Sequence, residues 1–232
     1  MPQPFSPDTT SLPSIFQSKW RSNPDPAALP FPANSPPFAL TPTDWHQLSL
    51  TDAHHTPHAW PNLQSLIANS QLEQLTRWPS QLKAYLAWTA HVQRVYGSAT
   101  TYLLEQRLFW KPLAGMELAF AVNDDTPFAH PHDFAILRND WGYALESDVA
   151  HVVVWLKQRL PVDGAGALSA EGVVMVEAFV DREFRREVGE RVKGERVLWF
   201  KNTTTLQSVR GLEHVHVLLR DVDEKVKEKW MK

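Results

Sequence analysis

The chain has 232 residues, a formal net charge of −3 and 43% hydrophobic residues, which is typical of a globular protein with one sizeable core. This charge favours neither nucleic acid nor an anionic membrane as a partner, and the lack of cysteine excludes disulfides and cysteine nucleophiles. Neither a secretory leader nor an apolar run of about 18 residues is visible. We therefore expect a cytoplasmic protein, with a nuclear presence left open.

Proline marks the first segment. Residues 1–42 hold eleven of the eighteen prolines, as in "NPDPAALPFPANSPPF", with Ser, Thr and Asn between them. Proline lacks a backbone donor and interrupts helices, so this segment is predicted to be a disordered or extended arm.

Helical spacing follows over residues 43–125. Thr43 or Asp44 is placed to cap a first short helix, and Pro79 and Gly97 bracket a longer one. The stretch "SATTYLLEQRLFW" predicts a third helix. We expect a small all-α unit that forms one compact body with the rest of the chain.

Residues 126–232 read as strands around one helix. The segments "FAILRND", "AHVVVWLKQRL", "ERVLWFKN" and "LEHVHVLLRD" are rich in β-branched and apolar residues. Ser169 is placed to cap a helix between the second and third of them. The predicted fold class is α+β, with a sheet crossed by a helix.

Strand alternation places the histidines. In the last strand, Val215, Val217 and Leu219 share one face and His214 and His216 the other. The apolar face is expected to pack on the helix, which leaves the imidazoles on the far face of the sheet. In the second strand, the same parity groups His151, Trp155 and Lys157. Three histidines and a lysine would then share one face.

Two kinds of chemistry could use such a face, and in a third interpretation the histidines have no chemical role. An imidazole can attack phosphorus and form a covalent intermediate. Three neutral imidazoles can instead bind a transition metal, namely Zn, Fe or Cu. Otherwise, the histidines are partly solvated residues on an open antiparallel face.

The order of these parts resembles the histidine-triad (HIT) superfamily between residues 133 and 219. "AHVVVWLK" is similar to a strand of that family, and "VLWFKN", a Gln-Ser-Val turn and "LEHVHVLL" follow in the family's order. The resemblance implies a HIT-like antiparallel sheet with a crossing helix. It also implies homodimerisation, by analogy only.

The resemblance implies roles for individual residues. His214 takes the central, nucleophilic position and His216 the third. Asn202 and Ser208 would orient and bind phosphate, and Asp140 would hold ribose hydroxyls. The sequence departs from the pattern at the first triad position, which is leucine, and the strand that carries His151 lacks the family's proline.

Three further residues are candidates for substrate binding. Trp141 and Trp155 are placed to stack on a planar ligand or to fill the core. Arg210 beside the Gln-Ser-Val turn is either an anion-binding group or the partner of a structural carboxylate. Arg77 and Arg107 present the same alternatives, and for these two the structural role is favoured.

A second resemblance covers nearly the whole chain after the arm. The stretches "LTRWPSQLKAYLAW", "YGSATTYLLEQRLFW", "ILRNDWGYALESDVAHVVVWLK" and "FKNTTTLQSVRGLEHVHVLL" resemble the fungal N-acetylglucosamine-induced protein 1 family, a domain of unknown function. It implies a fungal source but no reaction. Gly142 stands where the family tends to have proline, and Thr203 stands where an aromatic residue often follows "FKN". If these positions line the pocket, they would indicate a diverged substrate.

Three hypotheses for function follow. In the first, an intracellular hydrolase or transferase acts on a nucleotide-like or phosphorylated small molecule. His214 reacts with phosphorus, and His151 and Lys157 contribute charge near the leaving group. In the second, His151, His214 and His216 hold a transition metal for chemistry in fungal secondary metabolism. In the third, the chain binds a ligand without catalysis, which complete coverage of the histidine face by helices would favour.

Overall fold

The computed structural model describes residues 40–116, 118–164, 166–203, 206–207, 209 and 211–230. Nearly all of the predicted Pro-rich arm lies outside these residues. Within them, the strands form one four-stranded sheet in the order β1-β2-β4-β3, and every neighbouring pair is antiparallel. The predicted α+β class is confirmed. Among the described helices, none has the length and apolar character needed to cross a membrane.

The sheet is organised around its two central strands. Their pairing aligns Val149 with Arg220 and continues through Leu156 opposite Glu213. The shorter strands pair outside them. The bounds are β1 (Phe134–Arg138), β2 (Val149–Leu156), β3 (Val197–Phe200) and β4 (Glu213–Arg220).

Four α-helices precede the sheet in the described part of the chain: α2 (Pro42–Leu48), α3 (Trp60–Ala68), α4 (Pro79–Tyr96) and α5 (Ala99–Leu103). The first is capped by Thr41, not by Thr43 or Asp44 as expected. Thr41 accepts from the Asp44 backbone N–H, and the Asp44 carboxylate accepts from the backbone N–H of Thr41. This reciprocal box satisfies two donors, and the helix begins at Pro42, two or three residues earlier than a cap at Thr43 or Asp44 would give.

The longest helix begins and ends as its sequence predicts. Pro79 occupies the first turn of α4, where a missing N–H costs nothing. Gly97 follows the last turn with φ of 77°, a left-handed conformation that glycine adopts without strain. Ser98 then caps α5 by accepting from the Thr101 N–H. A π-helical turn, Leu104–Leu108, continues α5.

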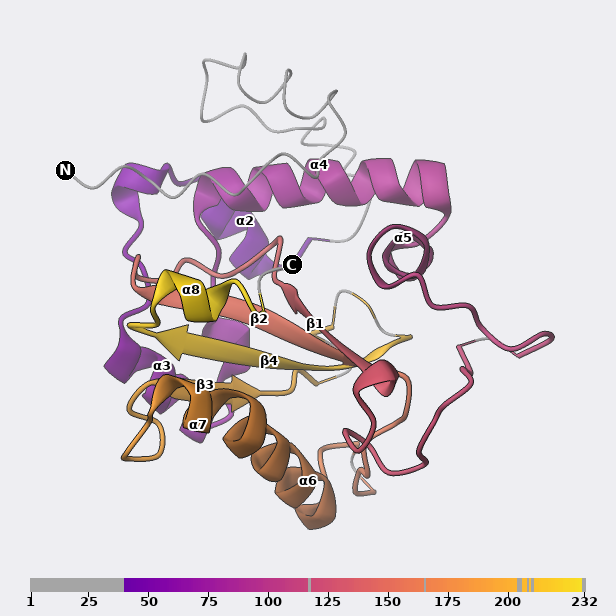
Figure 1. Cartoon of the computed structure of the whole chain (residues 1–232). Helices are drawn as coiled ribbons and strands as arrows, with labels where there is room; N and C mark the ends of the chain where they lie inside the picture. The colour runs from indigo at the N-terminus through magenta and orange to yellow at the C-terminus, as the bar shows by residue number, and fades with distance from the viewer. Residues whose placement is uncertain are drawn as a thin grey trace.

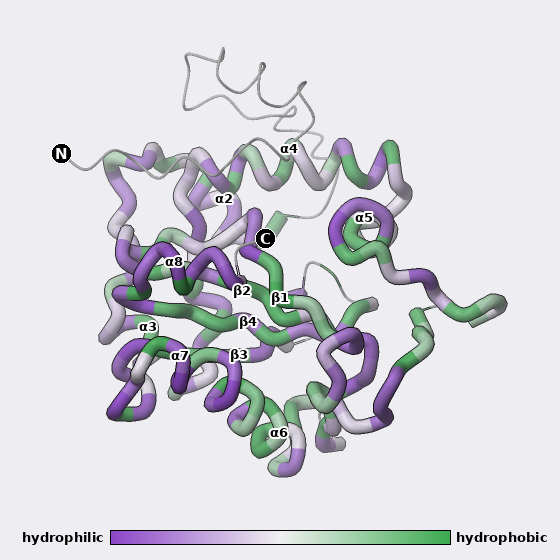
Figure 2. The backbone as a smooth tube through the Cα atoms, viewed as in Figure 1, coloured by the Kyte–Doolittle hydropathy of each residue, from purple (hydrophilic) through white to green (hydrophobic). Residues whose placement is uncertain are grey.

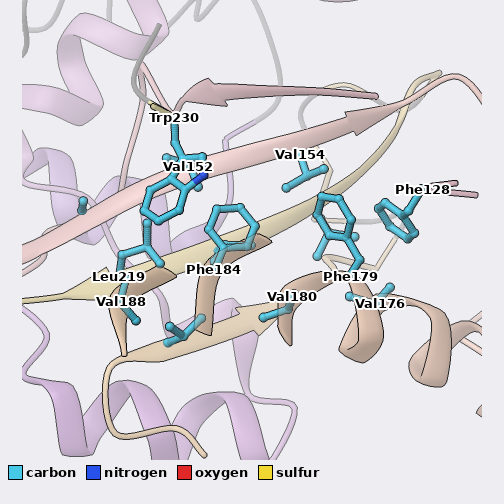
Figure 3. Close-up of a cluster of buried hydrophobic side chains, with 14 of the residues drawn as sticks. Phe128, Val152, Val154, Val176, Phe179, Val180, Phe184, Val188, Leu219 and Trp230 are labelled. Carbon is cyan, nitrogen blue, oxygen red and sulfur yellow. The ribbon is translucent and has the colours of Figure 1, made fainter. Parts of the chain in front are cut away.

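One face of the sheet packs against the helix that crosses it. This layer comprises α6 (Ala170–Val180), a π-helical turn (Asp181–Arg185) and α7 (Arg186–Val188), and Ser169 caps it as predicted. Figure 3 shows Phe179 and Phe184 pointing from this layer toward the strands. Val215, Val217 and Leu219 complete the same core. Near the C-terminus, α8 (Glu224–Lys227) is largely hydrophilic, whereas β2 and β4 are hydrophobic (Figure 2).

The N-terminal helices cover the opposite face. The sheet lies between α4 on one side and α6 on the other (Figure 1). Trp60 and Leu63 of α3 pack against Leu218 of β4. Leu104 and Leu108, after α5, pack against the β2 side chains of Val153 and Trp155. The helical segment and the sheet therefore share hydrophobic clusters, and the histidine face lies between them.

Replacing Phe184 by alanine should lower the free energy of unfolding by about 3–5 kcal/mol, because the ring is fully buried between the helix and the sheet. Urea denaturation measures the change. Val174→Ala is the matched control on the same helix, since Val174 is 67% exposed and its loss should change stability by no more than about 0.5 kcal/mol. Equal effects of the two substitutions would contradict the packing described above.

Candidate functional site

The antiparallel register brings the histidines of two strands together. Trp155 lies opposite His214, and Val153 lies opposite His216. His151 is two residues before Val153 on the same face, so its ring reaches His216 diagonally across the strands. The imidazoles lie on the face away from α6, as the alternation predicts.

His214 has one ring nitrogen in a defined role. Its Nδ1 lies 2.9 Å from the carbonyl oxygen of Leu212. A carbonyl only accepts, so Nδ1 carries the proton, and in the neutral ring the lone pair lies on Nε2. Burial lowers the pKa of His214, despite the opposing effect of the bond to Leu212. The side chain is therefore a neutral imidazole at neutral pH, with its Trp155 neighbour at a ring separation of 4.7 Å.

His216 differs because both of its nitrogens are engaged. Its Nδ1 lies 3.0 Å from Nε2 of His151, and its Nε2 lies 3.2 Å from the amide nitrogen of Asn202. The Asn139 amide lies 3.2 Å from His151 Nε2 and extends the chain at its other end. Because its nitrogens are used in this chain, His216 is suited to a supporting role and not to attack on a ligand.

Burial keeps this chain of side chains neutral. It lowers the pKa of His151 to about 3, and the nearby Arg77 charge adds to the effect. Burial lowers the pKa of His216 well below its ordinary value, and His151, His214 and Arg77 add to it. Charged imidazolium would lose its hydration here without gaining an acidic partner.

A cavity of about 540 Å³ opens on this face, a volume in the range of small-molecule sites. Its wall combines residues of the sheet, of the 137–143 segment and of the N-terminal helices. Six of the residues singled out from the sequence line it: His214, His216, Asn202, Asp140, Trp141 and Trp155.

Two other candidates lie outside the cavity wall. His151 lies behind His216, where it contacts Tyr143 and Phe200. Lys157 follows the end of β2, and its Nζ contacts the Ala121 carbonyl and the Asp133 carboxylate instead of the histidines. The reason is that the strand ends at Leu156, so alternation no longer directs the next side chain. Ser208 and Arg210 lie outside the described residues.

Two of the cavity residues have partners within the protein. Asp140 forms an ion pair with Arg107. Burial raises the pKa of Asp140, and Arg107 offsets part of that shift. Trp141 packs at ring separations of 5.6 Å from Tyr85 and 5.4 Å from Trp88, so neither of its contacts leaves a slot for a sandwiched base. Trp141 thus forms part of an aromatic wall.

The metal hypothesis finds no support in the geometry. Across the described residues, no group of three or more His, Asp or Glu side chains is arranged to hold an ion. His151 Nε2 and His216 Nδ1 point at each other at hydrogen-bonding distance, so these nitrogens do not converge on a common point with His214.

Residues 59–220 match the family model described as "Protein of unknown function (DUF3605)". The chain belongs to this family. It is 30% identical over 182 residues to N-acetylglucosamine-induced protein 1 of Candida albicans, which covers 73% of this chain and 70% of that relative. It is 27% identical over 164 residues to the uncharacterized protein YPL067C of Saccharomyces cerevisiae, which covers 69% and 77%. The resemblance to the N-acetylglucosamine-induced protein 1 family, noted from the sequence, is confirmed.

A solved structure shares the DUF3605 chain's fold. "Crystal Structure of HTC1" aligns with a TM-score of 0.59 and 25% sequence identity, and covers 73% of this chain and 91% of that one. Gly142 and Thr203, the two positions at which the sequence was expected to depart from the family, are not among the residues that line the cavity.

Sequence reasoning undervalued Arg77. It favoured a structural role for this residue, yet its side chain lines the cavity. The guanidinium lies 4.5 Å from the centre of the Tyr85 ring and 5.5 Å from that of Tyr143, and Nε donates to the Trp141 carbonyl. The signal in the sequence was an arginine between a small and an aromatic residue in "QLTRWP", which does not indicate the element that this side chain will face.

The buried histidines should make the protein sensitive to acid. The pKa of His151 is about 3 in the folded chain and near 6.5 when unfolded, so the unfolded state binds more protons between these values. This contribution to stability is complete above pH 6.5 and is lost as the pH falls. We expect His151 alone to lower the free energy of unfolding by about 2 kcal/mol between about pH 7 and pH 5.

Urea denaturation at the two pH values measures this loss. His151→Gln removes the titrating ring but keeps a polar contact to His216, so its loss between the two pH values should be smaller by that amount. His46 is exposed, and His46→Gln serves as the control that keeps the wild-type dependence. An unchanged dependence in His151→Gln would show that burial of this ring is not the cause.

Proposed function

We propose that this protein is an enzyme, a hydrolase or transferase, that acts on a nucleotide-like or other phosphorylated small molecule with His214 as its nucleophile. The observation that carries the proposal is the hydrogen bond from His214 Nδ1–H to the Leu212 carbonyl, which leaves the lone pair on Nε2. His214 lines a cavity of suitable size, and its lowered pKa keeps it unprotonated at neutral pH. A neutral, oriented imidazole is an effective nucleophile.

The proposed reaction has two steps. The Nε2 lone pair forms a bond to phosphorus while the bond from phosphorus to the leaving group breaks, and the leaving group departs with that electron pair. The ring becomes a cation, and its Nδ1–H bond to Leu212 strengthens. Water or an acceptor hydroxyl then attacks phosphorus and gives its proton to solvent. The bond from phosphorus to Nε2 breaks, and its electron pair returns to the nitrogen as the neutral imidazole.

The departure from the HIT pattern is compatible with this role. Leucine stands where the family has its first histidine, but the group that orients His214 is the backbone carbonyl of that residue and not its side chain. The Leu212 side chain itself is buried against Val153 and Trp155. His216 and Asn202 support the site from one side through their own hydrogen bond.

A non-catalytic ligand-binding role is the second candidate. The N-terminal helices pack over the histidine face, and His214 is only 4% exposed. A ligand would reach it only through the cavity. Such burial suits a sensor as well as an enzyme, so the test must distinguish binding from reaction.

The test is adduct formation at His214. The protein would be mixed with nucleoside diphosphates, dinucleoside polyphosphates and nucleoside phosphoramidates, and examined by intact-mass spectrometry for an acid-labile adduct. His214→Asn keeps a donor for the Leu212 carbonyl but removes the nucleophile, and it should lower turnover by roughly 10³-fold or more. His46→Gln should behave as wild type.

Turnover or adduct formation that survives in His214→Asn would exclude the nucleophilic role. Binding without any reaction, in both the wild type and this variant, would favour the ligand-binding candidate.

A further inference from the structure

Arg77 is held rigidly in the cavity wall, far in sequence from the histidines. Its guanidinium contacts the Tyr85 and Tyr143 rings, and Nε donates to the Trp141 carbonyl at 3.2 Å. These contacts use one of its five N–H donors. The terminal N–H groups have no hydrogen-bond acceptor among the described residues, so a pre-oriented cation lines the cavity.

Acidic residues do not neutralise this charge. No carboxylate lies within 4.0 Å of Arg77 in the described part of the chain, whereas Arg107 in the same wall pairs with Asp140. Two other carboxylates line the cavity: Asp44 is bound to Thr41, and Glu73 is exposed and forms no ion pair in that part of the chain. A partly buried cation without a counter-ion is costly unless a ligand supplies the charge.

The position of Arg77 separates it from the reacting end of the site. Its guanidinium lies 5.5 Å from the centre of the Tyr143 ring, which stacks on His151. The Tyr143 hydroxyl lies 3.4 Å from the amide nitrogen of Asn202, which also contacts His216. The neighbours of His214 are instead Trp155 and the Leu212 carbonyl. Arg77 therefore belongs to the His216 end of the cavity. No hydrogen bond or ring contact joins Arg77 to His214 in the described part of the chain, so we expect a group bound at Arg77 to be distinct from a phosphorus that His214 attacks.

From these contacts, we propose that Arg77 binds an anionic group of the ligand, a phosphate or a carboxylate, separate from the reacting phosphorus. The substrate would then carry two anionic groups, one beside Arg77 and one beside His214. The second anionic group, the phosphate that His214 attacks, rests on the proposed function. The anion site at Arg77 does not depend on it. A guanidinium presents paired donors that match either oxyanion.

Inorganic phosphate is the probe for this site, with binding measured by calorimetry at constant ionic strength. Arg77→Gln should weaken phosphate binding at least about tenfold, since one or two charge-assisted hydrogen bonds are lost. If Arg77→Gln unfolds, Arg77→Met is tested in its place, because methionine keeps the packing against Tyr85 and Tyr143. Circular dichroism reports folding of each variant.

Two controls isolate the charge of Arg77. The double variant Arg107→Gln with Asp140→Asn removes the neighbouring ion pair without changing net charge, and it should bind phosphate within about threefold of wild type. His214→Asn should also bind phosphate within about threefold of wild type, because the anion site at Arg77 is separate from the site at which His214 reacts. Acetate in place of phosphate tests whether a carboxylate also binds.

Wild-type binding that persists in folded Arg77→Gln would overturn the proposal, as would a wild type that fails to bind phosphate or acetate. Equal losses in Arg77→Gln and His214→Asn would mean a single phosphate site and would overturn the separation. Loss in Arg77→Gln alone, in a protein that forms no adduct at His214, would leave the anion site standing and reject only the nucleophile.

Discussion

The pairing of β2 with β4 is the constraint on which the rest of the structure depends. Eight consecutive residue pairs align these central strands. Side chains alternate along each, so one face carries valines such as Val152, Val154 and Val217, and the other carries imidazoles and Trp155. A slip of one residue would turn the histidines into the dry core and the valines toward the cavity. The register therefore decides both the stability of the core and the composition of the site.

The polar face is maintained at a cost in stability. Burial removes the hydrogen bonds that a neutral imidazole makes with water, which costs free energy. His151 and His216 offset part of this cost by contacting each other, and the amides of Asn139 and Asn202 contact them at the two ends. Arg77 adds a charge that resists protonation of these rings. Replacing buried polar groups by well-packed apolar side chains is often neutral or stabilising. This cost in folding stability is consistent with a face that is retained for binding or reaction, since buried polar groups often belong to functional sites.

The helical segment turns an open sheet face into a cavity. Trp60 and Leu63 anchor α3 to the sheet, and Leu104 and Leu108 anchor the segment after α5. Between these anchors, Tyr85 and Trp88 of α4 pack on Trp141 and form an aromatic wall. The same helices that exclude water from His214 thus shape the space through which a ligand would approach it. The family relationship describes the whole arrangement without naming its chemistry.

The sequence by itself determined the features that depend on local periodicity. Alternation in "LEHVHVLL" separated His214 and His216 from the valines, and Pro79, Gly97 and Ser169 marked helix ends, because these effects act over a few residues.

Only the tertiary structure decided which distant groups meet. Lys157 pairs with Asp133 at the end of β2, and Arg107 pairs with Asp140. Arg77 lines the cavity although it lies more than 130 residues before His214 in the chain. These contacts depend on how helices pack across the sheet. That packing arises from many weak contacts between elements, which a pattern within one element does not encode.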